Sequence, residues 1–256
     1  MREDARMAGT CMRCLIGIDD TDNPDTRGTG FRARQLGDRL AESGLAATRG
    51  ITRHQLLVHP DIPYTSHNSS ACLDVELDPA ALSELIAFAR EYLANESADG
   101  SDAGLCVSPF GGVSQAIIAF GGSAKREVLT LDQATDLAAR DGVHLEGVTG
   151  DHMGMIGALS AVGLRRGGGD GRFIWLKGVR ELYEPTTTAR LLTTTGIESV
   201  ETIDGRPVPP DARIRVDPWP RPVLLGDRAV LLAEESGSKN DNYDWEVLGK
   251  ETIRRY

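Results

Sequence analysis

The stretch LIGIDDTDNPDTRGTG, residues 15–30, determines how the rest of the chain is interpreted. A short apolar run ends in three aspartates, Asp19, Asp20 and Asp22, and the glycine-flanked Thr29 follows seven residues after the last of them. The polar residues in between suit a turn after a strand. A turn alone does not explain the aspartates, because like charges this close repel each other unless a cation or a donor lies between them.

Carboxylates at the carboxyl end of a strand are typical of ligand sites in α/β proteins. We therefore predict that the three aspartates bind Mg²⁺ through one or two carboxylates, with nucleotide phosphates as further ligands. Gly28 and Gly30 allow a ligand to approach the backbone, and a helix that begins here points N–H groups at an anion. The alternative for Thr29 is a simple helix cap, and the spacing alone favours neither role.

The pattern of apolar residues predicts alternating strands and helices on both sides of this motif. We expect strands at 13–19, 51–58 and 70–77, with helices from Gly30 to about Ser43 and from Pro79 to about Ala94. This order predicts an α/β (α+β) fold with a ferredoxin-like sandwich.

Further along the chain we expect helices at 114–126, 131–141 and 153–164, a strand at 173–179, short strands after 180 and a strand at 228–235. The predicted domains are an N-terminal α/β lobe at 11–100, a second α/β lobe at 104–236 and a C-terminal tail at 237–256 that docks through Trp245 and Val247.

Composition limits the class of protein. The chain has 256 residues and a net charge of −10, which argues against a protein that grips nucleic acid chiefly through phosphates. No apolar run is long enough to span a membrane, and residues 1–10 lack the apolar core of a signal peptide, so we expect a cytoplasmic protein. Cys11 and Cys14 form a CxxC without a second pair, so we interpret them as ordinary thiols.

Two other stretches contain candidate ligand-binding residues. His67 and Asn68 lie at the entrance of the predicted strand at 70–77, although a loop histidine is often only solvated. The glycine-rich segment at 147–158 resembles a phosphate-binding turn without the spacing of a P-loop. The remaining candidates for binding an anionic nucleotide are Arg27, Arg32, Gly150, Asp151 and Gly154.

Four segments together resemble the archaeal agmatidine synthetase family, whose members attach agmatine to a cytidine of an isoleucine tRNA. They are IGIDDTD, RGTG, HPDIPYTSHNSSACLDVEL and GMIGALSAVGL, in this order between Ile16 and Leu164. The resemblance implies a kinase-like ATP-binding lobe joined to the ferredoxin-like sandwich. It also implies that Asp19, Asp20 and Asp22 bind Mg²⁺ and ATP, and that Thr29 matches the threonine that the family phosphorylates.

The chain departs from this family after these segments, where the family carries an OB-fold and a zinc ribbon that place the tRNA. The four cysteines of such a ribbon are missing here. Together with the acidic charge, this favours an ATP-dependent ligase or phosphotransferase that acts on a small acceptor such as a nucleoside or nucleotide. The alternatives are a tRNA-modifying enzyme with a separate RNA-binding partner and a non-catalytic nucleotide sensor. The sequence leaves open whether the protein forms a homodimer.

Overall fold

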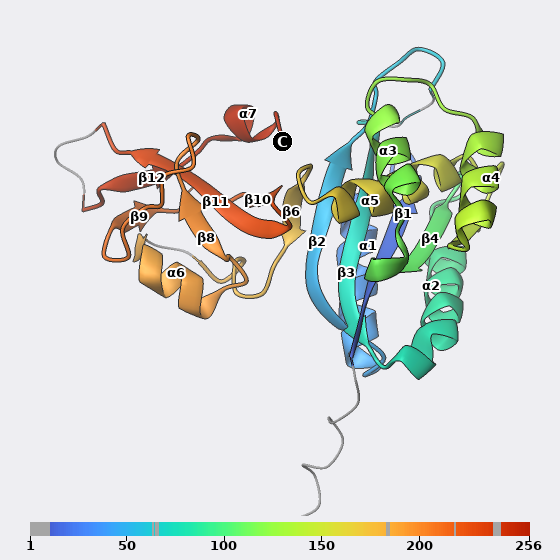
Figure 1. The fold of residues 1–256 in the computed structure, drawn as a ribbon, viewed down its shortest axis with the longest axis horizontal. Coiled ribbons are helices and arrows are strands. Elements are labelled where there is room, and N and C mark those ends of the chain that lie inside the picture. Colours follow the sequence, from blue (N-terminus) through green and yellow to red (C-terminus); the bar gives the residue numbers. More distant parts are fainter. Residues whose placement is uncertain (1–10, 63, 65–66, 183–184, 218, 238–241) are drawn as a thin grey trace, which may run out of the picture.

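The computed structural model describes residues 11–62, 64, 67–182, 185–217, 219–237 and 242–256. Residues 1–10, on which the prediction about a signal peptide rests, therefore lie outside the described residues. Figure 1 shows two parts side by side, an N-terminal α/β unit with helices on both faces of its sheet and a smaller C-terminal unit built mainly of strands. Strand β6 lies between them and continues the sheet from one unit into the other.

The first part of the chain has the predicted ferredoxin-like order of strands. Four strands lie in the order β4-β1-β3-β2, and every neighbouring pair is antiparallel. The elements are β1 (Met12–Asp19), α1 (Thr29–Glu42), β2 (Ala47–Gln55), β3 (Ser69–Leu77), a 3-10 turn (Pro79–Ala81), α2 (Leu82–Glu96) and β4 (Gly104–Pro109). The side chain of Asp78 accepts a hydrogen bond from the Ala80 N–H and caps this turn.

Alternate residues of β1 enter two separate cores, as expected for a strand buried on both faces. Ile16 and Ile18 pack with Leu36 of α1 and Leu93 of α2 on one face. Leu15 packs with residues of α3 and α5 on the other face. Because both faces of the sheet are buried, the ends of its strands are the part of the first unit at which polar side chains can gather around a ligand.

The second group of elements covers the other face and extends both edges of the sheet. It comprises a 3-10 turn (Phe110–Gly112), α3 (Gln115–Ser123), α4 (Leu131–Asp141), β5 (His144–Gly147), α5 (Gly154–Gly167) and β6 (Arg172–Trp175). Helix α4 begins with a capping box in which the side chains and backbones of Thr130 and Gln133 bond reciprocally. Strand β5 pairs with β4, and β6 pairs with β2.

The C-terminal unit adds short strands around β11. Its elements are β7 (Thr186–Thr187), α6 (Thr188–Thr194), β8 (Ser199–Glu201), β9 (Arg213–Arg215), β10 (Val223–Leu225), β11 (Arg228–Glu235), β12 (Trp245–Val247) and α7 (Lys250–Ile253). Trp245 and Val247 of the predicted tail lie in β12, which pairs with β11 and β9. The predicted domain boundaries stay predictions. Strand β4 begins the predicted second lobe but pairs with β1 of the predicted first lobe.

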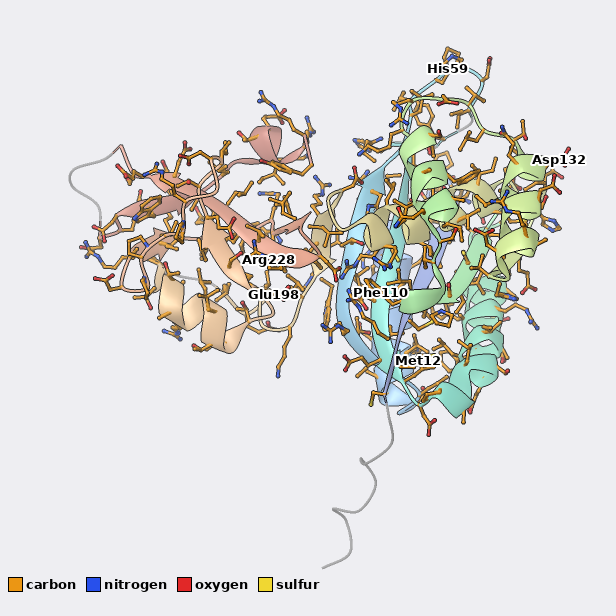
Figure 2. The ribbon with its side chains drawn as sticks, in the orientation of Figure 1. Met12, His59, Phe110, Asp132, Glu198 and Arg228 are labelled. Atoms are coloured by element: carbon orange, nitrogen blue, oxygen red, sulfur yellow. The ribbon has the colours of Figure 1, made fainter. Side chains whose placement is uncertain are left out.

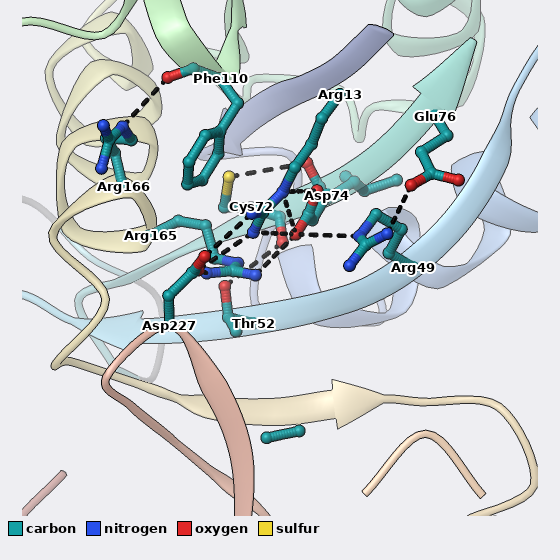
Figure 3. Close-up of polar contacts among 12 residues, drawn as sticks. Arg13, Arg49, Thr52, Cys72, Asp74, Glu76, Phe110, Arg165, Arg166 and Asp227 are labelled. Carbon is teal, nitrogen blue, oxygen red and sulfur yellow. Dashed lines mark hydrogen bonds and ion pairs between the residues drawn. The ribbon is translucent and has the colours of Figure 1, made fainter. Parts of the chain in front are cut away.

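A buried ion cluster joins the two units (Figure 3). Asp74 of β3 is 1% exposed and accepts hydrogen bonds from Arg13 at 2.8 Å and Arg165 at 2.6 Å. Both arginines also bind Asp227, at 2.9 Å and 2.6 Å. Asp227 lies in the two-residue turn between β10 and β11, where it and Gly226 both have positive φ, as a type I′ hairpin requires. Two charges of each sign thus neutralise one another where the units meet.

Among the described helices, none has the length and apolar character that crossing a bilayer requires. The cytoplasmic location stays a prediction. Cys11 and Cys14 are both free thiols. Burial raises the pKa of the Cys14 thiol to about 12, so this sulfur is protonated and unreactive at neutral pH.

Candidate functional site

The predicted site lies at the end of the first unit's sheet where β1 terminates. Met12, at the start of β1, and His59, in the loop after β2, lie at opposite ends of this unit (Figure 2). Asp19 is the last residue of β1, and a pocket opens beside it. This pocket, which we call the acidic pocket, has a cavity volume of about 120 Å³ and opens to solvent. Seven of the predicted residues line it: Asp19, Asp20, Asp22, Thr29, His67, Asn68 and Gly154.

The turn after β1 forces carboxylates together. Asp20 adopts a positive φ of 50°, an uncommon conformation for a residue other than glycine. Burial raises the pKa of Asp19 to about 7, and the neighbouring charges of Asp20 and Asp22 add to the effect. Burial also raises the pKa of Asp20 to about 6, with contributions from Asp102 and Asp22. These carboxylates repel one another, so a cation that bound among them would relieve the repulsion.

Helix α5 places its glycines against these aspartates. A Cβ atom on Gly157 would come within 1.7 Å of Asp19 Oδ2, so only glycine leaves room for this carboxylate at the start of the helix. A Cβ atom on Gly17 would lie 2.1 Å from the Ala158 carbonyl oxygen. The glycine-rich sequence of α5 therefore serves close packing on β1, and this packing holds Asp19 in the pocket.

Asp22 holds Thr29 rather than pointing freely into solvent. Its Oδ1 accepts hydrogen bonds from the Thr29 N–H at 3.2 Å and from the Thr29 hydroxyl at 3.0 Å. The Thr21 hydroxyl donates to Thr29 Oγ1 at 3.2 Å. Thr29 is the first residue of α1, and Gly28 is the N-cap, so the interpretation of Thr29 as a simple cap is wrong. A hydroxyl that donates a hydrogen bond to a carboxylate can lose its proton to that carboxylate and act as a nucleophile.

The donor set suits a hard cation that is only partly coordinated by the protein. Among the described residues, no three acidic, histidine or cysteine side chains form a ready-made metal-binding group. Magnesium usually takes one or two protein carboxylates and fills its octahedron with water and phosphate oxygens. Asp19 and Asp20, whose pKa values are raised by burial and by the neighbouring carboxylates, fit this limited role. Magnesium binding by Asp19, Asp20 and Asp22 remains a prediction.

Another part of the wall of the acidic pocket is largely apolar, although Asp61 and Glu127 also belong to it. It comes mainly from the loops after β2 and α3 and from the start of α5. Tyr64 is 48% exposed, Val128 44% and Met153 39%, which is unusual for side chains of this size. Such a surface suits the flat face of a nucleobase. The remaining apolar lining residues are Leu56, Ile62, Ala124, Leu129 and Ile156.

A second depression, which we call the basic hollow, adjoins the acidic pocket and encloses about 1220 Å³ with its opening. Both contain Asp22, Thr29, His67 and Ser69 in their walls, so they are continuous. The other polar lining comes from the start of α1 and from arginines: Arg27, Gly28, Gly30, Arg34, Arg53 and Arg180. The predicted residues Arg27, Gly28 and Gly30 thus lie here, beside the aspartates.

Three predicted residues lie elsewhere. Arg32 is bound to Glu96 at 3.0 Å, on the side of α1 that faces α2, so its prediction as a ligand-binding residue finds no support in this geometry. Gly150 and Asp151 are exposed and line neither depression. The Asp151 N–H instead donates to Asp102 Oδ1 at 2.7 Å, which connects the loop before α5 to a neighbour of Asp20.

The sequence interpretation missed the residues that only tertiary structure brings to the site. Arg53 lies in β2, and nothing in its local pattern distinguishes it from other strand arginines. Glu127 and Val128 belong to the loop between α3 and α4, remote in sequence from the aspartates. Tyr64 and Asp61, in contrast, belong to the segment HPDIPYTSHNSS that carries the family resemblance, and this proximity could have indicated them.

Comparisons with known proteins extend this description. No family model matches the chain. An uncharacterized protein of Methanocaldococcus jannaschii is 28% identical over 155 residues, which span 59% of this chain and 50% of the relative. A crystal structure of TiaS with an isoleucine tRNA and ATP matches with a TM-score of 0.52 and 26% identity, over 59% of this chain and 36% of that chain.

Two more TiaS structures agree with this likeness. Apo TiaS, described as an agmatidine synthetase for an isoleucine tRNA, matches with a TM-score of 0.51 and 26% identity, over 59% of this chain and 35% of that chain. The complex of TiaS with the same tRNA, AMPCPP and agmatine matches with a TM-score of 0.51 and 21% identity, over 71% of this chain and 44% of that chain, which shows the fold alone. The chain thus has a TiaS-like α/β fold but spans half of the curated relative and less than half of the TiaS chains.

Proposed function

We propose that this protein is an ATP-dependent enzyme that modifies RNA by activating an oxygen through phosphoryl transfer in the acidic pocket. The observation that carries the proposal is the pairing of Thr29 with Asp22 beside the crowded carboxylates of Asp19 and Asp20. The apolar wall of the same pocket supplies a surface for the adenine base. TiaS, which has a similar fold, is crystallised with ATP.

Each residue has a distinct task in this proposal. Magnesium would neutralise charge on the phosphates and on the carboxylates of Asp19 and Asp20. Asp22 orients the Thr29 hydroxyl and accepts its proton as the oxygen forms a bond to the terminal phosphorus. The bond from that phosphorus to the bridging oxygen breaks, and the bridging oxygen leaves with the nucleotide. The phosphoryl group can then pass from Thr29 to the acceptor oxygen, which restores the hydroxyl.

RNA is a better candidate for the acceptor than our sequence analysis allowed. The net charge of −10 is a sum over the whole surface, whereas binding depends on the field at the site. The basic hollow concentrates four arginines beside Thr29. Two TiaS structures of similar fold contain an isoleucine tRNA. The expectation that tRNA is disfavoured therefore has no support, and a small free acceptor becomes the second choice.

ATP binding tests the proposal at Asp20. We expect calorimetry to detect ATP binding with Mg²⁺ and little binding in EDTA. Asp20→Asn should weaken binding about tenfold or more, because a neutral amide oxygen only partly replaces an anionic ligand. Asp25→Asn is the matched control, since Asp25 is exposed in the same loop and lines neither depression. Equal affinity in EDTA, or equal losses in the two variants, would rule out this role.

A further inference from the structure

Six arginines around the basic hollow take part in no ion pair among the described residues. These arginines are Arg27, Arg34, Arg53, Arg172, Arg180 and Arg221. We call the surface that they form together with Trp219 the arginine face. The arginines come from the loop before α1, from α1, β2 and β6, and from the loops of the C-terminal unit. Arginines elsewhere are mostly paired, as Arg32 is with Glu96 and Arg90 with Glu146. An acidic protein that gathers six such arginines in one place has a surface complementary to an anion.

The arginines are close enough to repel one another. Burial lowers the pKa of Arg34, and the charges of Arg180 and Arg27 lower it further. Burial also lowers the pKa of Arg172 to about 10, with contributions from Arg53 and Arg221. This repulsion opposes folding, and bound phosphates would remove it. The face is too wide for one phosphate, since it extends from α1 across β2 to β6.

An aromatic ring lies at one end of the arginines. Trp219 is 36% exposed, and the Arg180 guanidinium lies 5.5 Å from the centre of its ring. Arg221 donates to the Trp219 carbonyl oxygen at 3.0 Å, which fixes the loop that carries the ring. Arg180 and Ile174 also line the basic hollow, so ring and hollow are neighbours. A basic groove beside an exposed aromatic ring is typical of proteins that bind single strands.

We infer that the arginine face binds single-stranded RNA, with phosphates on the arginines and a base stacked on Trp219, and leads the strand to Thr29. This inference rests on the proposed function for the reaction at Thr29. Single strands fit better than duplexes because stacking on a protein ring requires an unstacked base. Arg172, Arg180, Trp219 and Arg221 lie beyond Leu164, where the sequence resemblance ends, so the C-terminal unit supplies its own part of the surface.

Fluorescence anisotropy with a labelled oligouridylate, without ATP, tests the inference on the full chain. We expect the double change Arg53→Ala and Arg172→Ala to weaken binding at least tenfold. It should also reduce the slope of log K against log salt by about 0.7 for each phosphate that is no longer bound. Trp219→Ala should weaken binding about 5- to 100-fold with an unchanged slope. Arg190→Ala is the control, because Arg190 lies exposed on α6 and lines neither depression.

Thermal unfolding of each variant separates loss of binding from loss of fold. Arg180→Ala provides a second test at an exposed loop position, if the double change unfolds the protein. Absence of binding by the parent at about 50 mM salt would overturn the inference, as would equal effects of the double change and Arg190→Ala. Equal competition by a duplex of the same length would do so too. ATP consumption without RNA binding would leave phosphoryl transfer at Thr29 intact but shift the acceptor to a small molecule, and RNA binding without ATP consumption would leave only the inference.

Discussion

Two clusters of charge in the molecule are built on opposite principles. At the junction of the units, Asp74 and Asp227 face Arg13 and Arg165, so the buried charges are balanced and every short contact joins opposite signs. In the acidic pocket, Asp19 and Asp20 lie together without an arginine or lysine among the described residues that line it. In the first arrangement, loss of one member would leave a buried charge unpaired, so the fold depends on the intact cluster. The second opposes folding and leaves charge available for a ligand.

The same contrast separates the arginines into two groups. Arg165 is 4% exposed and fully engaged with two aspartates, so it is not available to an anionic ligand. Arg34 and Arg53 line the basic hollow and form no ion pair within the part of the chain that the structure describes. Charge that is neutralised within the protein is structural, whereas uncompensated charge of one sign marks a binding site. Substitutions in the two clusters should therefore change stability in opposite directions.

The largest effect is expected at the balanced cluster. Asp74→Ala leaves the buried Arg165 guanidinium with only Asp227, and we expect the free energy of unfolding to fall by about 3–5 kcal/mol. Urea denaturation measures it. Asp204→Ala serves as a control, because its ion pair with Arg206 is exposed and should contribute little. A decrease at Asp74 no greater than that of the control would remove the contrast between the clusters.

The unbalanced cluster should respond with the opposite sign. The raised pKa values mean that folded Asp19 and Asp20 hold protons up to about pH 7 and 6, whereas the unfolded chain releases them near pH 4. Stability should therefore fall as the pH rises from about 4 to 7. Asp19→Asn should remove part of this dependence and stabilise the protein by about 1–2 kcal/mol at pH 8, measured by thermal unfolding in EDTA. If Asp19→Asn destabilised the protein and its stability fell with rising pH as in the parent, the result would contradict this account.

A smaller effect is expected at Asp227. Burial raises the pKa of this carboxyl, but hydrogen bonds from Arg13 and Arg165 outweigh burial and lower the pKa overall. The stabilisation from Asp227 is therefore complete above about pH 4 and disappears as the pH falls through its folded pKa. Asp227→Asn should destabilise the protein at pH 7, and its effect should become smaller as the pH falls below about 4, as measured by urea unfolding. Equal destabilisation above and below this pH would indicate a packing role instead.

Local sequence rules predicted the elements whose signals are local. The helix predicted at 131–141 and the strand predicted at 228–235 both have the predicted bounds. Strand β4 (Gly104–Pro109) was missed because it is short and its pairing with β1 depends on residues some ninety positions earlier. The residue type of Thr29 fits a cap, but the capping oxygen comes from Asp22.

The ligand-binding residues were predictable where they follow the DDTD motif and not where folding assembles them. Arg32 and Arg34 look alike in sequence, yet two helical positions turn a side chain by about 200°. Arg34 consequently faces the basic hollow, whereas Arg32 faces Glu96. Arg180 joins them only because β6 brings the C-terminal unit beside β2. No local pattern contains that information.

The most direct test of phosphoryl transfer in the acidic pocket is the release of ADP from ATP and Mg²⁺ by Thr29 variants. The parent and Thr29→Ser should consume ATP in the presence of RNA, and Thr26→Ala, a control in the exposed part of the same loop, should match them. Thr29→Ala should keep its fold and lose about a hundredfold or more in rate, because it lacks the hydroxyl that Asp22 holds. Parental turnover by Thr29→Ala, or ATP binding without any nucleotide release by the parent, would contradict the account and favour a nucleotide sensor.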